Sequence, residues 1–179
     1  REENMETLKQ ALSAAGIAYQ ENEPLSAHCT FRIGGPADVF VLPENEEQLC
    51  RSIALCRETG AKYYLLGNGS NILFEDAGYR GAIIDVSTMK TGIGFIENID
   101  FPGKDPALTY YAVIAGAGCR LSSLCMAALN DSLTGLEFAY GIPGTVGGAV
   151  YMNAGAYGGE IKDVLASVRY LTRKGDIVE

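Results

Sequence analysis

Two glycine-rich segments constrain this chain more than any other feature of its sequence. Residues 66–71 read Leu-Gly-Asn-Gly-Ser-Asn, and residues 141–148 read Gly-Ile-Pro-Gly-Thr-Val-Gly-Gly. The first segment follows an apolar run over residues 62–66 that predicts a buried strand. Glycine lets backbone N–H groups turn inward where a Cβ would clash, and converging amides bind anionic oxygen. Two such loops predict a long cofactor that carries a diphosphate and is held at more than one place.

The composition argues against several other classes of protein. The net charge of −8 argues against binding along a nucleic-acid backbone. A single nucleotide would therefore have to be held locally, by backbone amides and dipoles. The apolar stretches are too short to span a bilayer, and we expect no membrane association. The five cysteines are scattered and lack CxxC spacing, which predicts reduced thiols in a cytoplasmic protein. Because His28 is the only histidine, we expect no metal site.

Hydrophobic periodicity predicts that helices and strands alternate along the chain. Helices are predicted over residues 5–15, 44–59 and 121–130, and a short one begins near Thr145. Strands are predicted over residues 37–42, 62–66, 82–86 and 108–115. A hairpin joins residues 164–172 to residues 176–178, and the pattern is weak between residues 87 and 106.

The first glycine loop has a plain structural interpretation as well. Asn-Gly pairs are common in turns, so residues 67–71 could be only the turn that follows a strand. The loop matches neither the P-loop pattern nor G-x-G-x-x-G. It offers amides but no lysine, which favours a diphosphate held statically over a phosphoryl group being transferred.

The second glycine loop precedes a run that is compatible with a helix. A helix that begins near Thr145 would present free N–H groups to an anion. The glycines could equally make room for close packing of that helix on a sheet, and both interpretations can hold. Small residues continue over residues 153–160, which suits a flat ring system or tight backbone packing. Tyr157 would place a hydroxyl at the edge of such a site.

Two side chains near the start of the chain have open roles. Arg32 lies in the segment Thr-Phe-Arg-Ile-Gly-Gly-Pro, where it could meet a phosphate or a carboxylate or form a structural ion pair. His28 lies in a polar loop just before that segment, and we expect it at the surface.

Four motifs occur in the order of a known family. They occupy residues 30–38, 67–73, 141–148 and 153–158. Together they closely resemble the UDP-N-acetylenolpyruvoylglucosamine reductases, the flavoproteins that make UDP-N-acetylmuramate for bacterial peptidoglycan. The forms Thr-Phe-Arg-Ile-Gly-Gly and Tyr-Gly-Gly-Glu are similar to the shorter of the two subtypes of that family.

The resemblance implies an α+β fold of two FAD-binding lobes, of the PCMH and vanillyl-alcohol-oxidase type, with non-covalent FAD between them. We expect the first lobe over residues 1–80 and the second, incomplete at its C-terminus, over residues 81–179, with the substrate-binding domain of the family beyond this sequence. The diphosphate loop would comprise Gly67, Asn68, Gly69, Ser70 and Asn71. Further positions that match residues lining FAD are Leu65, Ile142, Pro143, Gly144, Gly148, Ala154 and Gly155, and Tyr157 matches a position near the substrate.

The same resemblance implies an oxidoreductase that moves a hydride from NADPH through the flavin to the enolpyruvyl group of a UDP-sugar. The arginine, serine and glutamate that complete catalysis in the family would fall beyond Glu179. We therefore assign no catalytic residue here and expect FAD binding without turnover. Two alternatives stay open: another flavin oxidase or dehydrogenase of the same fold, and a nucleotide-binding module without redox activity. The sequence leaves the oligomeric state undetermined.

Overall fold

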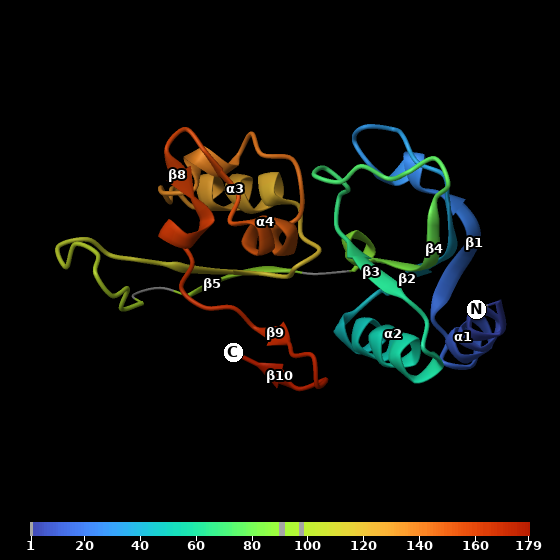
Figure 1. Cartoon of the computed structure of the whole chain (residues 1–179). Coiled ribbons are helices and arrows are strands. Elements are labelled where there is room, and N and C mark those ends of the chain that lie inside the picture. The colour runs from blue at the N-terminus through green and yellow to red at the C-terminus, as the bar shows by residue number, and fades with distance from the viewer. Residues whose placement is uncertain (1, 90–91, 97–98) are drawn as a thin grey trace. The chain divides into compact units, whose positions relative to one another are not determined.

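The computed structural model describes residues 2–89, 92–96 and 99–179 (Figure 1). Backbone contacts divide the chain into two compact units. Unit 1 comprises Arg1–Lys90 and Arg173–Asp176, and unit 2 comprises Thr91–Thr172 and Ile177–Glu179. The combination of helices and sheets in both units is the α+β class that the sequence predicts.

Unit 1 is built on one four-stranded sheet. Its strands are β1 (Ala18–Pro24), β2 (Pro36–Leu42), β3 (Tyr63–Leu66) and β4 (Tyr79–Asp85), in the order β1-β2-β4-β3. The pair β1–β2 is antiparallel, whereas β2–β4 and β4–β3 are parallel. Because β4 lies between β2 and β3, a boundary at residue 80 would cut through the sheet. The structure therefore keeps the residues up to 90 in the first unit, ten more than we expected.

Two helices, α1 (Glu2–Ala14) and α2 (Glu46–Thr59), lie side by side against this sheet (Figure 1). The side chain of Asn45 caps α2 by accepting a hydrogen bond from the Gln48 N–H at 2.9 Å. Gly60 ends the helix in the left-handed conformation. These local signals explain why the predicted helix over residues 44–59 is confirmed to within two residues.

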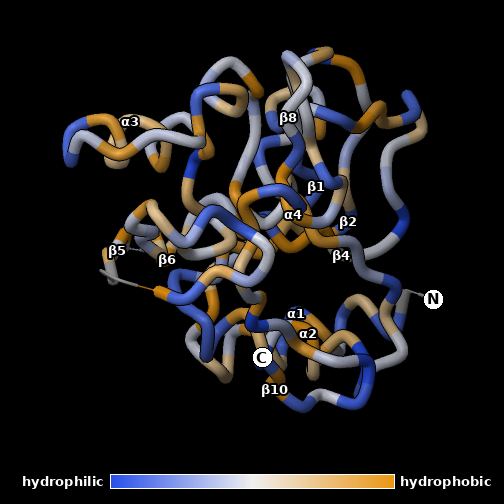
Figure 2. Tube along the Cα trace, turned by 90° about the vertical axis from the view of Figure 1, so that its left-hand side faces the viewer, coloured by the Kyte–Doolittle hydropathy of each residue, from blue (hydrophilic) through white to orange (hydrophobic). Residues whose placement is uncertain are grey.

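The core of unit 1 is apolar and well defined. Strands β2 and β4 are rich in apolar residues, which Figure 2 colours orange. One cluster of buried side chains joins the two central strands, β2 and β4, to Leu66 of β3 and to the segments that precede them in the chain. Its members are Leu25, Cys29, Ala37, Phe40, Leu66, Phe74 and Ile83.

Unit 2 combines short strands with two helices. Strands β5 (Ile93–Ile96) and β6 (Ala112–Ala115) form an antiparallel pair. Helices α3 (Leu121–Asn130) and α4 (Val146–Met152) pack together, and a tight hairpin of β7 (Gly155–Ala156) and β8 (Gly159–Glu160) follows them. A second hairpin pairs β9 (Tyr170–Leu171) with β10 (Ile177–Val178). The core is formed by Leu121, Leu124, Cys125, Ala139, Ala149 and Ile161.

One predicted strand differs in its burial, and two strands were not predicted. The strand over residues 62–66 forms, but Tyr64 and Leu65 are each 45% exposed because β3 lies at the edge of its sheet. Strand β1 was not predicted because its residues, Ala-Tyr-Gln-Glu-Asn-Glu-Pro, are mostly polar and exposed. Strand β5 lies in the stretch where the pattern is weak. None of the helices in the described ranges is long and apolar enough to cross a membrane.

Candidate functional site

Two parallel strands of unit 1 end at the same edge of the sheet. Leu66 of β3 lies opposite Asp85 of β4, so the glycine loop of residues 67–71 and the 3₁₀ helix Val86–Thr88 begin side by side. A cavity of about 430 Å³ lies there. It is lined by Ala27, His28, Cys29, Thr30, Arg32, Gly67, Asn68, Asp85 and Ser87.

Several residues that line this cavity carry hydrogen-bond donors. Within the part of the chain that the structure describes, the backbone N–H groups of Gly67 and Asn68 make no hydrogen bond. Thr30, Ser87 and Arg32, whose hydroxyls and guanidinium can donate hydrogen bonds, line the same space. The carboxylate of Asp85 is already engaged, because it accepts a hydrogen bond from the Ser87 N–H at 2.8 Å. This donor set suits an anionic group, and a diphosphate fits its chemistry.

Gly69 also has a structural task in this loop. Its φ is +61°, and a Cβ at this position would lie 2.0 Å from the carbonyl oxygen of His28. The Gly69 carbonyl accepts a hydrogen bond from the Thr30 N–H at 3.1 Å. Gly69 therefore lets the glycine loop approach residues 28–30 closely, and this contact joins the two walls of the cavity.

His28 is half-buried, in contrast to the surface role we expected. Its ring stacks on Phe40 with the ring centroids 4.1 Å apart, and Nε2 lies 2.8 Å from Oε1 of Glu23. The neighbouring Cys29 is buried, and its thiol donates to the Ile33 carbonyl oxygen at 3.3 Å. The wall opposite the glycine loop is thus fixed to the core of unit 1.

The beginning of α4 is not an anion site, which contradicts one of our two interpretations of the second loop. The N–H of Val146 donates to the Cys119 carbonyl at 2.8 Å, and that of Gly147 donates to the Ala117 carbonyl at 2.9 Å. The third N–H, of Gly148, donates to Oγ1 of Thr145 at 3.3 Å. The glycines do make room for close packing, although against the turn that follows β6 and not against a sheet, because a Cβ on Gly147 would lie 2.8 Å from that of Ala117.

The predicted contact residues in unit 2 differ in their surroundings. Ile142 and Ala154 are half-buried and pack against the core of that unit. The carbonyl of Gly144 accepts a hydrogen bond from the Leu121 N–H at 3.0 Å. Pro143, Gly148 and Gly155 are exposed. In unit 1, Leu65 lies on the edge strand, Ser70 is half-buried, and Asn71 is exposed.

Tyr157 occupies the turn of the β7–β8 hairpin. Tyr157 and Gly158 both have positive φ, at +53° and +86°, and the Tyr157 side chain is 95% exposed. Two-residue turns with this geometry favour asparagine and glycine, so an aromatic residue there is strained. Asn153 braces the hairpin by donating to Oε2 of Glu160 and accepting from the Lys162 N–H, each at 2.9 Å. Hydrogen bonds from Lys162 and Asn153 lower the pKa of the Glu160 carboxyl.

Replacing the strained tyrosine is expected to stabilise unit 2. Tyr157→Asn removes a solvent-exposed side chain and suits the positive φ, so the free energy of unfolding should rise by about 1 kcal/mol. Tyr157→Phe is the matched control, since it keeps the strain and removes only the hydroxyl. Urea titrations followed by circular dichroism measure both. A less stable asparagine variant would mean that the ring makes contacts that outweigh the strain.

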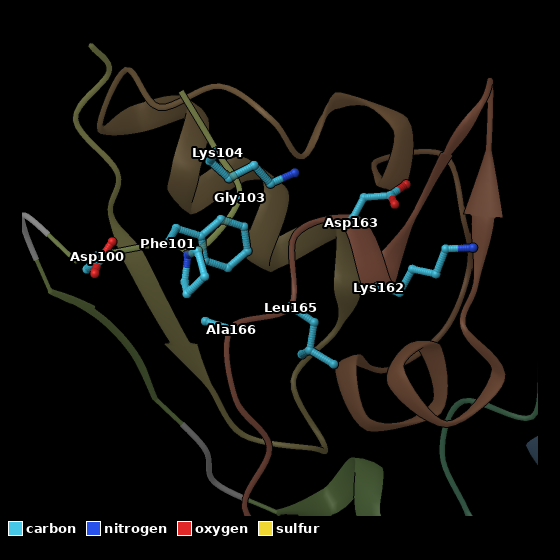
Figure 3. Close-up of a pocket in the computed structure, with 9 residues that line it drawn as sticks. Asp100, Phe101, Gly103, Lys104, Lys162, Asp163, Leu165 and Ala166 are labelled. Carbon is cyan, nitrogen blue, oxygen red and sulfur yellow. The ribbon is translucent and has the colours of Figure 1, made fainter. Parts of the chain in front are cut away.

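A second cavity, of about 460 Å³, lies in unit 2 (Figure 3). Three of its four charged residues make described contacts. The amine of Lys104 lies 5.4 Å from the centre of the Phe101 ring, and Lys162 pairs with the Glu160 carboxylate. Asp163 accepts a hydrogen bond from the Glu160 N–H at 3.0 Å. This cavity is therefore a weaker candidate for a ligand than the cavity of unit 1.

Thr30, Asp85 and Ser87 line the first cavity although they were not among the predicted site residues. One signal could have identified Ser87: it follows a predicted strand, and parallel strands present their carboxyl ends at the same edge. No group of three His, Cys, Asp or Glu side chains within the described ranges could hold a metal ion.

Comparison with known proteins gives consistent results. The FAD binding domain family matches residues 37–179. The UDP-N-acetylenolpyruvoylglucosamine reductase of Lachnoclostridium phytofermentans is 44% identical over 174 residues, which cover 97% of this chain and 53% of that protein. The corresponding reductase of Syntrophomonas wolfei is 46% identical over 87% of this chain and 48% of its own length. The chain thus spans about half the length of the curated relatives it matches.

A solved structure supports the fold. The crystal structure of UDP-N-acetylenolpyruvylglucosamine reductase from Thermus caldophilus superposes with a TM-score of 0.56 and 29% sequence identity. The matched region covers 90% of this chain and 51% of that one.

Proposed function

This chain belongs to the family of FAD-binding domains, and from that membership we propose that unit 1 holds FAD by its diphosphate. The observation that carries the proposal is that Gly67 and Asn68 line the cavity and that their N–H groups donate to no described residue. Gly69, Ser70 and Asn71 complete the loop. Leu65 and the residues Ile142, Pro143, Gly144, Gly148, Ala154 and Gly155 are the further contacts that we propose for this cofactor.

We further propose that the chain is the cofactor-binding part of a cytoplasmic, NADPH-dependent reductase of peptidoglycan precursor synthesis. The similarity to the two reductases over most of its length supports this assignment. The chemistry that FAD supplies when bound is hydride transfer from NADPH to the enolpyruvyl double bond of UDP-N-acetylglucosamine enolpyruvate, giving UDP-N-acetylmuramate. The chain itself binds and orients, and the exposed Tyr157 ring is proposed to contact the UDP-sugar.

An absorption spectrum and a titration of the purified chain test the proposed cofactor. We expect the chain to bind FAD non-covalently, so that acid precipitation releases all the flavin colour into the supernatant. Calorimetry should show tighter binding of FAD than of riboflavin, because riboflavin lacks the diphosphate that the Gly67 and Asn68 amides are proposed to hold. Equal affinities would place the diphosphate elsewhere, and a covalent flavin would favour another oxidase of the same fold.

A further inference from the structure

Most cations of unit 1 with described contacts pair with a carboxylate, whereas Arg32 does not. Arg80 pairs with Oδ1 of Asp38 at 2.7 Å, and Arg51 pairs with Oε1 of Glu58 at 3.0 Å. Lys9 pairs with two glutamates. The Arg32 guanidinium has no ion pair or hydrogen bond with any residue that the structure describes. The structural ion pair that the sequence left open is therefore not found for Arg32.

The position of Arg32 is set by an unusual backbone. Its φ is +54°, a conformation that an arginine adopts only at a cost in free energy. The turn is closed by a hydrogen bond from the Arg32 N–H to the Cys29 carbonyl at 3.2 Å, and Cys29 itself is buried. The core of unit 1 thus holds Arg32 at the cavity that Gly67 and Asn68 also line.

We propose that Arg32 is the cation that binds the diphosphate of FAD and makes the cavity select a diphosphate over an uncharged flavin. This inference rests on the proposed function. A guanidinium can bind two phosphate oxygens at once, and a charge-assisted hydrogen bond is stronger than one from a neutral amide. The two amides would fix the position of the phosphates, and Arg32 would neutralise their charge. In a chain of net charge −8, an unpaired cation at this cavity also offsets the repulsion of a dianion.

Calorimetric titration of the Arg32→Gln variant with FAD and with riboflavin tests this assignment. We expect the affinity for FAD to fall by about 10- to 100-fold, which is typical for the loss of a hydrogen bond to a charged group. The affinity for riboflavin should stay the same. The wild-type affinity for FAD should fall with added salt, and this dependence should be weaker in the variant. Arg32→Lys should fall between the two, because it keeps the charge and loses the planar fork.

Two further variants serve as controls. One tests the effect of the backbone conformation at position 32, and the other tests the effect of the net charge of the chain. Arg32→Gly removes the guanidinium but fits the positive φ, so it should lose FAD affinity as Arg32→Gln does. Arg51→Gln removes an arginine on the exposed face of α2, away from the cavity, and should bind FAD like the wild type. Wild-type affinity and salt dependence in Arg32→Gln would overturn the assignment of Arg32. A wild-type chain that fails to bind FAD would instead overturn the proposed function.

Discussion

Gly69→Ala is expected to destabilise unit 1 by about 4 kcal/mol or more and to abolish FAD binding. The added Cβ would lie 2.0 Å from the His28 carbonyl oxygen and 2.8 Å from Cα of Cys29, and both belong to a backbone that cannot rotate away. The left-handed φ adds its own cost. Calorimetric unfolding and FAD titration measure the two effects.

Gly16→Ala is the matched control for this variant. Gly16 lies in the same unit and has φ +68°, close to the +61° of Gly69, but a Cβ there meets nothing within 4 Å. It should cost about 1 kcal/mol and leave FAD binding intact. Equal effects of the two substitutions would show that backbone conformation alone, and not the contact with residues 28–30, makes Gly69 necessary.

Phe40→Ala is expected to cost about 3–5 kcal/mol, the usual range for truncating a buried aromatic side chain. Phe40 is fully buried on β2 and stacks on His28. It belongs to the same cluster as Leu66, which precedes the glycine loop, and Cys29, which lines the cavity. Its loss should therefore loosen both walls of the proposed diphosphate site as well as lower the unfolding temperature of unit 1.

Two variants serve as controls for Phe40→Ala. Phe40→Leu keeps most of the apolar volume and should cost much less. Leu121→Ala removes a fully buried side chain from the core of unit 2, so it should lower the stability of that unit and spare the first. Calorimetry distinguishes the units if they unfold separately. A Phe40→Ala variant with wild-type stability and flavin affinity would contradict a role for this core in positioning the site.

The sequence predicted most helices well, and the strands less well. The bounds of α3 match the prediction, and those of α2 differ by two residues, because capping residues and apolar periodicity are local signals. Strand β1 was not predicted because its own residues carry no strand pattern. Its pairing with β2 is what stabilises it. The order β1-β2-β4-β3, which moves the unit boundary past residue 80, depends on contacts distant in sequence.

The candidate site shows the same division between local and distant information. The loop of residues 67–71 was identified because glycines after a strand are visible in the sequence. The glycines at the beginning of α4 have the same local pattern, yet the carbonyls of Ala117 and Cys119 take up two of the N–H groups there. No local pattern reveals an acceptor that lies almost thirty residues away, so only the structure separates the two loops. Thr30 and Arg32 likewise line the same cavity as Gly67 and Asn68 only because the fold brings these distant segments together.

The place of β3 in the sheet has a consequence for biosynthesis. Within the described sheet β3 pairs only with β4, and β4 comes later in the chain. On a ribosome, the β1–β2 pair can form as soon as residue 42 has emerged, whereas β3 must wait until the residues up to 85 are available. The loop that follows β3 therefore takes its final shape late, and the proposed diphosphate site would not be complete in a nascent chain before β4 has been inserted.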